Sequence, residues 1–190
     1  QNPLMTLGII TAAVLLIGDE ILSGRTKDAN AGFIAERLTE LGIDLKEIRV
    51  VADDDDQIVE ALNALRARYS YVFTTGGIGP THDDIRADAV AKAFGVALPI
   101  HPEVEADMPR YFGERLNEAR LRMARVPEGG ELFYAECIIA PGFRIGNVHV
   151  MAGVPKIMQS MFQAIAPTLK TGPRVLSETI LANAKEGDVG

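Results

Sequence analysis

The most informative stretch of this sequence is Thr74–Asp84, TTGGIGPTHDD. A strand is predicted just before it, over Tyr69–Phe73, because aromatic and β-branched residues alternate there. Three glycines within four residues allow positive φ and let a ligand approach the main chain without meeting a Cβ. Two carboxylates then fall in the first turn of a predicted helix, where the helix dipole favours negative charge. The stretch therefore predicts either a ligand-binding loop or an ordinary strand-to-helix turn capped by aspartate.

Strand-loop-helix units follow one another through the first half of the chain. An almost continuous apolar run over Ala12–Ile17 predicts a strand buried on both faces, with helices above and below it. Ile43–Val51 predicts a second strand, nearer an edge of the sheet, and the aspartates of 53–56 are expected to cap the helix that follows. Such units predict a mostly parallel sheet in an α/β fold, with ligands beyond the carboxyl ends of the strands.

The second half adds a hairpin and a last helix. Residues 131–151 predict a β-hairpin with Gly146-Asn147 at its turn, leading into one more core strand. Ala152–Pro155 forms a fourth strand-to-helix loop, with Pro155 suited to the first helical position. We expect one domain over residues 12–170. Residues 1–11 are interpreted as a cloning remnant and leader, and residues 171–190 as a C-terminal extension that is truncated or disordered.

Composition and charge argue against several classes of partner. The chain has 26 acidic and 19 basic residues and a formal net charge of −7, so neither nucleic acid nor an anionic membrane surface is an expected partner. The longest apolar run, Leu7–Ile17, is too short to span a membrane and favours a core strand over a signal peptide. The single cysteine, Cys137, cannot form an internal disulfide and fits a reducing compartment, so we expect the cytoplasm.

The predicted loops carry backbone amides and carboxylates but no familiar catalytic motif. A Walker lysine and a GxGxxG motif are both absent, and His82, His101 and His149 lack the spacing of zinc ligands. Asp83 and Asp84 would repel a phosphate held by the glycine loop, by about 4 kcal/mol for unit charges roughly 4 Å apart. A divalent cation between them would relieve this repulsion, and oxygen ligands favour magnesium, manganese or a similar ion.

The segment His101–Arg125 differs from its surroundings. It predicts two short helices and contains arginines that outnumber Glu114 and Glu118. A run of charge usually forms a solvated face, and an anion-binding patch is the alternative; both interpretations stay open. The arginines are Arg110, Arg115, Arg120, Arg122 and Arg125.

In combination, these motifs resemble the molybdopterin-binding domain shared by MoaB- and MogA-like proteins and by the amino-terminal half of CinA-type competence/damage-inducible proteins. The resemblance rests on TTGGIGP over 74–80 with Asp84 downstream. The phrase GDEILSG over 18–24, Asn30 and the form PTHDD over 80–84 are most similar to the CinA branch. The resemblance implies a three-layer α/β/α sandwich, an assembly that is often trimeric or otherwise oligomeric, and a ligand at the loops.

The resemblance also implies roles for particular residues. Asp84 is expected to be the loop aspartate linked to catalysis, and Asp53 its catalytic partner, at the end of the strand expected to neighbour that of the glycine loop. A divalent metal ion, magnesium, manganese or cobalt, is expected at Asp83 and Asp84. The expected ligand-binding residues are Gly18, Glu20, Ser23, Gly24, Asp28, Asn30, Thr75, Gly76, Gly77, Gly79, Thr81, Gly153 and Pro155.

Two functions remain open. Members of the CinA branch are associated with metal-dependent hydrolysis of nucleotide pyrophosphates such as ADP-ribose, and a related domain acts on FAD. The resemblance therefore implies a divalent-metal-dependent nucleotide pyrophosphatase, whose glycine-loop amides stabilise charge on a phosphoryl group. The alternative is non-catalytic binding or delivery of molybdopterin in molybdenum cofactor biosynthesis. In both cases we expect a homo-oligomer and a small-molecule nucleotide or pterin phosphate as partner.

Overall fold

A computed structural model describes residues 9–76, 83–134 and 141–173, with only the backbone described for 83–86. The expectations for Gly77, Gly79, Thr81 and His82 lie outside these ranges, as do those for Cys137, most of the leader and most of the C-terminal extension. The side chains of Asp83 and Asp84 also lie outside them. Within these ranges, no helix combines the length and the apolar character needed to cross a bilayer.

One six-stranded sheet forms the middle of the molecule, in the order β2-β1-β3-β6-β5-β4. The strands are β1 (Ile10–Ile17), β2 (Ile43–Val51), β3 (Tyr71–Thr75), β4 (Glu131–Phe133), β5 (Gly142–Ile145) and β6 (Val148–Met151). β1, β2, β3 and β6 run parallel, whereas β4 and β5 pair antiparallel. The predicted mostly parallel sheet with an added hairpin is confirmed, and Gly146-Asn147 connects β5 to β6.

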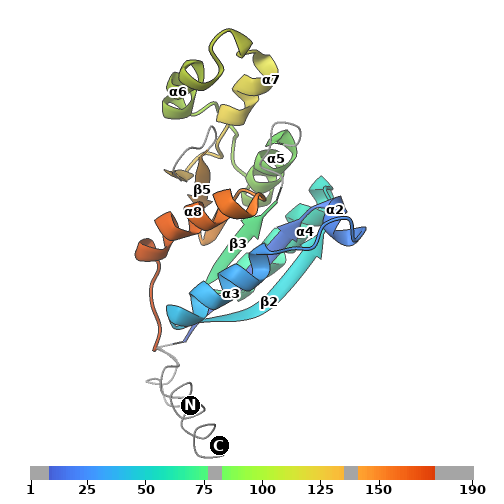
Figure 1. The fold of residues 1–190 in the computed structure, drawn as a ribbon, viewed down its shortest axis with the longest axis vertical. Helices are drawn as coiled ribbons and strands as arrows, with labels where there is room; N and C mark the ends of the chain where they lie inside the picture. The colour runs from blue at the N-terminus through green and yellow to red at the C-terminus, as the bar shows by residue number, and fades with distance from the viewer. Residues whose placement is uncertain (1–8, 77–82, 135–140, 174–190) are drawn as a thin grey trace, which may run out of the picture.

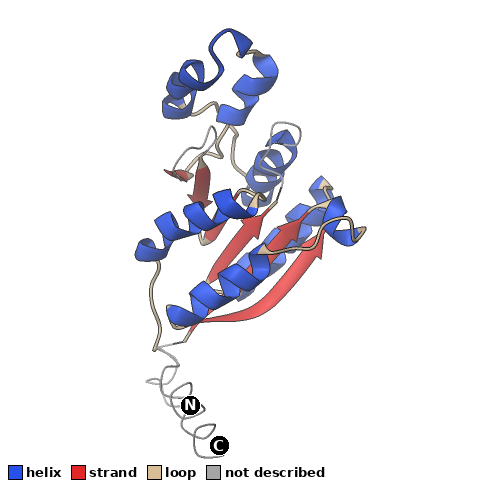
Figure 2. Ribbon diagram, in the orientation of Figure 1, coloured by secondary structure: helices blue, strands red, loops and turns tan. Residues whose placement is uncertain are grey.

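Helices cover both faces of this sheet (Figures 1 and 2). They are α2 (Asp19–Leu22), α3 (Asn30–Glu40), α4 (Asp55–Arg68), α5 (Asp83–Phe94), α6 (Pro102–Phe112), α7 (Glu118–Leu121) and α8 (Pro155–Ile165), with 3-10 turns at Gly113–Arg115, Arg122–Ala124 and Ala166–Thr168. Asp54 caps α4 as predicted, since its Oδ1 accepts a hydrogen bond from the Gln57 N–H at 3.0 Å. Pro155 is the first residue of α8, also as predicted.

Strand β1 divides its side chains between two hydrophobic cores. Leu15 and Ile17 pack in the core that contains α4 and α5, whereas Val14 and Leu16 pack in the core that contains α3 and α8. Because successive side chains of a strand point to opposite faces, an unbroken apolar run suits a strand that is covered on both sides. The three-layer α/β/α sandwich is thus confirmed.

Two expectations about the strands are wrong. β3 begins at Tyr71 instead of Tyr69, because the Tyr69 N–H still donates to the Leu65 carbonyl at 3.0 Å and closes α4. β2 does not neighbour β3, because β1 pairs with both and lies between them. Asp53 therefore follows the edge strand and is one strand further from the glycine loop than expected. Consecutive strand-helix units fix the direction of the strands but not their order across the sheet.

The segment 101–125 extends beyond one end of the sheet, where α6 and α7 stand apart from the other helices (Figure 1). It has a small core of its own around Val104 and Met108. The segment has five arginines and also five carboxylates, since Glu103, Glu105 and Asp107 add to Glu114 and Glu118. Its formal net charge is therefore zero, and the arginines do not make it basic. The guanidinium of Arg120 lies 5.1 Å from the ring centre of Phe112, and Arg125 lies 3.4 Å from Asp88. These local contacts favour the solvated surface over the anion-binding patch.

Candidate functional site

The carboxyl ends of β1, β3 and β6 lie together at one edge of the sheet, because these strands are parallel. A cavity of about 310 Å³ lies at this edge. Its lining residues are Glu20, Ile21, Thr26, Lys27, Asp28, Ala29, Asn30, Thr75, Gly76, Gly153, Val154 and Pro155. This cavity brings together seven of the predicted ligand-binding residues: Glu20, Asp28, Asn30, Thr75, Gly76, Gly153 and Pro155.

Asn30, the first residue of α3, ties two of these loops together. Its Nδ2 donates to Thr75 Oγ1 at 3.2 Å and to the Gly153 carbonyl at 2.9 Å, and the side chain is buried. Because a carbonyl can only accept, the contact with Gly153 fixes which end of the amide is nitrogen. Asn30 Oδ1 is buried and has no hydrogen-bond partner among the described residues. An unsatisfied buried acceptor costs about 1–3 kcal/mol, so this oxygen needs a donor or a cation.

Gly76 brings the end of β3 directly against the end of β1. Its φ is +113°, and a Cβ at this position would overlap the carbonyl oxygen of Ile17. The main chain can leave β3 along this path only because Gly76 has no side chain. The start of the glycine loop is therefore held beside the loop that carries Gly18 and Glu20.

Carboxylates lie along the rim of the cavity. Asp28 Oδ2 accepts from the Ala31 N–H at 2.8 Å and so supports the start of α3. The Glu20 carboxylate folds over Gly18, whose missing Cβ leaves room for it. Asp19 Oδ1 accepts from the Asp53 N–H at 3.2 Å, which joins the loops after β1 and β2. Asp53 is thus beside the site, but the described lining of the cavity does not include it.

Ser23 and Gly24 lie on an exposed turn rather than in the cavity lining. Ser23 Oγ donates to the Glu20 carbonyl at 3.3 Å and accepts from Arg25 Nε at 3.1 Å, so its hydroxyl shapes this turn. Gly24 has a φ of +77°, with no heavy atom within 4 Å of a Cβ built on it. Gly18 is buried, and its N–H donates to the Val51 carbonyl at 3.0 Å.

Two residues have features that the sequence analysis did not predict. Lys27 lines the cavity and brings a positive charge next to Asp28. The only sign of this in the sequence is that Lys27 lies between two predicted ligand-binding residues, Gly24 and Asn30. Asp55 opens α4, and burial, followed by the charge of Asp88, raises the pKa of its carboxyl. Its Oδ1 is buried without a partner in the described part of the chain. A protonated carboxyl would be stabilised by this environment.

The residues around the cavity supply oxygen atoms of the kind that hard divalent cations prefer. Asn30 Oδ1 is an unsatisfied acceptor, and Glu20 and Asp28 provide carboxylates. Across the ranges that the structure describes, no three His, Cys, Asp or Glu side chains converge closely enough to hold a metal ion. A cation at this edge would therefore need further oxygens, from a phosphorylated ligand or from residues in the 77–84 stretch.

Residues 13–171 match the protein family described as "Probable molybdopterin binding domain", and the chain belongs to this family. Among solved structures, the protein CinA of unknown function from Thermoplasma acidophilum is similar, with a TM-score of 0.79 and 33% identity over 84% of this chain and 98% of that one. MoaB from Thermus thermophilus shares the fold, with a TM-score of 0.56 and 19% identity over 85% and 92% of the two chains.

Curated proteins of similar sequence match most of this chain but only part of their own length. A CinA-like protein from Desulfosudis oleivorans is 36% identical over 168 residues, and a protein named probable FAD synthase from Caenorhabditis elegans is 34% identical over 181 residues. Each match covers 84% of this chain but only 41% and 35%, respectively, of the relative. A further protein, from Archaeoglobus fulgidus, is 35% identical over 159 residues, which is 84% of this chain and 69% of that protein. The chain is CinA-like and spans less than half of two of these relatives.

The sequence analysis set His149 aside for lack of zinc-ligand spacing, yet it is a buried titratable group. It is only 2% exposed, and its ring stacks on Phe73 with 5.2 Å between ring centres. Burial, and to a lesser extent the positive charge of Arg144, lower the pKa of His149 from 6.5 to about 4. Arg144 on β5, Glu131 on β4 and Tyr71 on β3 are the titratable or charged groups that line the same cavity as the imidazole.

This shift predicts a pH-dependent stability. The unfolded chain binds a proton at His149 below about pH 6.5, whereas the folded protein does not bind it until about pH 4, so protonation favours unfolding. The stability is fully present above pH 6.5 and falls as the pH drops toward 4, by at most about 3 kcal/mol for a shift of this size. Urea unfolding of the parent and of His149→Phe between pH 7 and 4 measures this contribution of His149 to the free energy of unfolding. Parallel pH profiles for the two proteins would contradict it, since the carboxylates titrate equally in both.

Proposed function

We propose that this chain is a CinA-type, divalent-metal-dependent nucleotide pyrophosphatase acting on a substrate such as ADP-ribose or FAD. The observation that carries the proposal is the unsatisfied Asn30 Oδ1, which lines a cavity together with Glu20, Asp28 and Lys27. Acceptor oxygens suit a cation, and a lysine suits the phosphate that such a cation would accompany. The name of one relative, probable FAD synthase, agrees with a nucleotide ligand.

In this proposal, water adds to one phosphorus and the P–O–P bond breaks, which releases two phosphate monoesters. Lys27 pairs with a phosphate oxygen, while Asn30 Oδ1, Glu20 and Asp28 are the described oxygens available to a divalent cation. A bound cation would neutralise phosphate charge and lower the pKa of a water molecule. Asp84, in the first turn of α5, and Asp53, whose N–H is held by Asp19, complete the proposed catalytic pair.

The alternative is binding or delivery of molybdopterin without turnover. The family description and the size of the cavity favour it, because about 310 Å³ is near the lower end of small-molecule pockets. A pterin would fill such a cavity, whereas FAD would extend over the surrounding loops. Both functions use the same residues, so an experiment that separates them must measure chemistry and binding together.

The test panel contains ADP-ribose, FAD and a reduced pterin phosphate, each with magnesium, manganese, cobalt or a chelator. Both the binding of each compound and the release of phosphate monoesters are measured. We expect metal-dependent hydrolysis of a nucleotide pyrophosphate. Lys27→Met should weaken binding of that substrate by roughly ten- to a hundredfold, as for the loss of a hydrogen bond to a charged group. Lys46→Met is the matched control, because Lys46 is on β2 and pairs with Asp44 at 3.7 Å. Tight pterin binding without hydrolysis of any substrate would favour the alternative.

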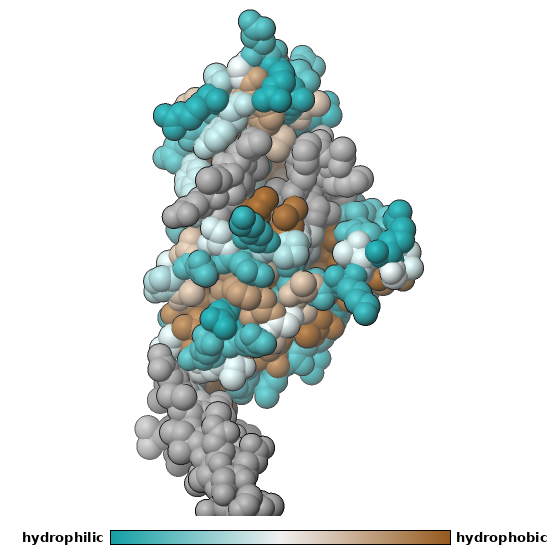
Figure 3. Space-filling view, in the orientation of Figure 1, coloured by the Kyte–Doolittle hydropathy of each residue, from teal (hydrophilic) through white to brown (hydrophobic). Residues whose placement is uncertain are grey.

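The proposal includes a homo-oligomer and a cytoplasmic location. Large apolar side chains are exposed on separate parts of the surface, among them Leu22, Ile48 and Val154. On the face drawn in Figure 3, apolar patches are separated by polar surface, so this face does not present one continuous apolar interface. We expect light scattering at micromolar concentrations to give a multiple of the 20.5 kDa chain mass. A constant mass of one chain over that range would contradict self-association.

A further inference from the structure

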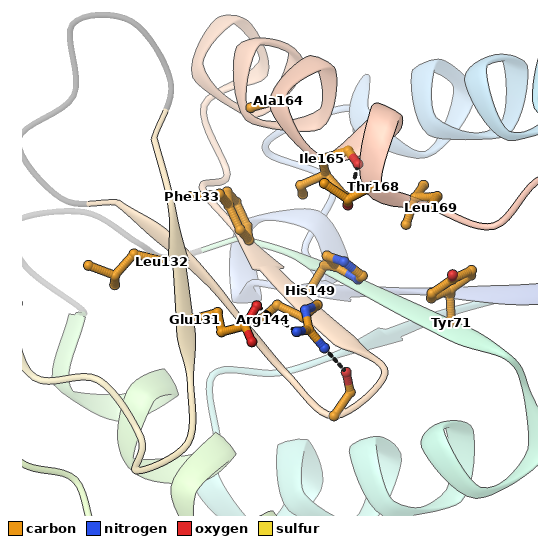
Figure 4. Close-up of a pocket in the computed structure, with 11 residues that line it drawn as sticks. Tyr71, Glu131, Leu132, Phe133, Arg144, His149, Ala164, Ile165, Thr168 and Leu169 are labelled. Carbon is orange, nitrogen blue, oxygen red and sulfur yellow. Dashed lines mark hydrogen bonds and ion pairs between the residues drawn. The ribbon is translucent and has the colours of Figure 1, made fainter.

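A second cavity, of about 260 Å³, is lined by residues at the opposite end of β3 and β6 from the candidate site. Tyr71 opens β3, and His149 lies on β6. Thr168 ends the 3-10 turn that follows α8, and Leu169 comes next. Figure 4 shows the His149 ring among these residues, with Phe133 on one side and Tyr71 on the other. The proposed pyrophosphatase does not use this cavity, so its chemistry needs a separate explanation.

Three of the residues that line the cavity, Tyr71, Phe133 and His149, are aromatic. The His149 ring centre lies 5.8 Å from that of Tyr71 and 6.3 Å from that of Phe133. Aromatic faces and edges arranged around a ring favour another flat ring in an offset or edge-on position. The volume is below the usual range for drug-sized ligands, which limits the occupant to about one or two rings.

Two polar groups give the cavity a hydrogen-bonding character. His149 Nδ1 is buried and has no partner among the described residues, and the whole side chain is almost completely shielded from solvent. The Tyr71 hydroxyl accepts from the Lys170 N–H at 3.0 Å, which leaves its own proton to donate. A ligand edge that both donates and accepts, such as an amide or a lactam, would complement these two groups.

The charges around the cavity cancel. Arg144 pairs with Glu131 at 2.6 Å and donates to the Gly146 carbonyl at 3.0 Å, so its positive charge is already compensated. Burial keeps the imidazole of His149 neutral near pH 7, because it lowers the pKa of that ring. An anionic ligand would have to displace Glu131 from Arg144, and a cationic ligand would meet no uncompensated carboxylate among the described residues that line the cavity.

We propose that this second cavity binds a small, neutral, planar heteroaromatic molecule whose amide or lactam edge hydrogen-bonds to His149. The class includes single-ring nucleobases and aromatic carboxamides. Binding here is independent of the proposed pyrophosphatase, because it uses none of the residues at the carboxyl ends of the strands.

The test uses uracil and nicotinamide as neutral probes, and toluene and benzoate as apolar and anionic controls. Each is titrated into the parent protein while the His149 Cε1–H resonance is followed by NMR. We expect saturable shifts with at least one neutral probe, and binding at least about tenfold weaker for toluene and for benzoate, equivalent to loss of about one hydrogen bond. Absence of saturation with both neutral probes, or tighter binding of benzoate or toluene, would overturn the proposal.

Two variants locate the binding. His149→Phe keeps a ring against Phe73 and removes the nitrogen, so we expect at least about tenfold weaker binding, measured by calorimetry or ligand-observed NMR. Ala164→Phe adds a ring at an exposed position of α8 that lines the cavity, which blocks the cavity without altering the core. Lys27→Met, in the first cavity, should bind the probe as the parent does. Unchanged binding in both His149→Phe and Ala164→Phe would place the probe elsewhere and overturn the proposal.

Discussion

Replacement of Asp84 by asparagine is expected to lower the turnover of a nucleotide pyrophosphate by at least about a hundredfold, the low end for a positioned acid or base. Asparagine keeps the shape of the side chain and much of its hydrogen bonding, but it removes the charge that would hold a cation or activate water in the proposed enzyme. Asp84 is the second residue of α5, directly after the glycine loop. Loss of its charge should also let a phosphorylated ligand bind as well or better without metal, since repulsion is relieved.

Turnover and metal-free affinity must be measured on the same preparations, with manganese or magnesium and then with chelator. Asp56→Asn is a matched control, because Asp56 is an exposed carboxylate near the start of α4 whose contact is an ion pair with Lys92 at 3.4 Å. The control makes the same change of charge and should keep parent turnover. Hydrolysis that is indifferent to Asp84 would exclude Asp84 as a catalytic residue. Absence of hydrolysis by the parent across all substrates and metals would remove the enzymatic function and leave the binding function.

The fold could be predicted because its signals are local. The apolar run of β1 needs cover on both faces, and Pro155 and Asp54 mark helix starts by their own chemistry. The order of strands across the sheet could not be predicted in the same way. It depends on which edges pair, and the parallel edges of β1 accept β2 on one side and β3 on the other. This is why Asp53 was expected one strand too close to the glycine loop.

The candidate site could be predicted in part for a similar reason. Asn30, Thr75 and Gly153, which the resemblance implied as ligand-binding residues, lie together where the parallel strands end. Their roles follow from contacts between distant parts of the chain, since Asn30 reaches a carbonyl 123 residues away and is left with one unsatisfied oxygen. His149 is a second case. Its sequence neighbours say nothing of Phe73 and Tyr71, whose rings bury the imidazole and depress its pKa.

Gly76→Ala is expected to lower the free energy of unfolding by about 4 kcal/mol, the largest effect on stability that we predict, from the sum of two effects. One part is backbone strain, because the φ of +113° costs a residue with a Cβ about 1–3 kcal/mol. The other part is overlap of the new Cβ with the Ile17 carbonyl, which forces β1 or the glycine loop to move, at about 1–3 kcal/mol for overpacking. Urea unfolding followed by circular dichroism measures the sum.

Two other glycines separate these contributions. Gly95 also has a positive φ, +65°, but a Cβ there meets no heavy atom within 4 Å, so Gly95→Ala should cost only about 1–2 kcal/mol of strain. Gly32 lies inside α3 in open space, and Gly32→Ala should stabilise the protein by about 0.5–1 kcal/mol. The order of unfolding midpoints should therefore be Gly32→Ala, parent, Gly95→Ala and Gly76→Ala. If Gly76→Ala and Gly95→Ala lowered the free energy of unfolding equally, the main chain after β3 would move to accept a Cβ with little loss of stability. The close approach to Ile17 would then not be what holds the glycine loop beside β1.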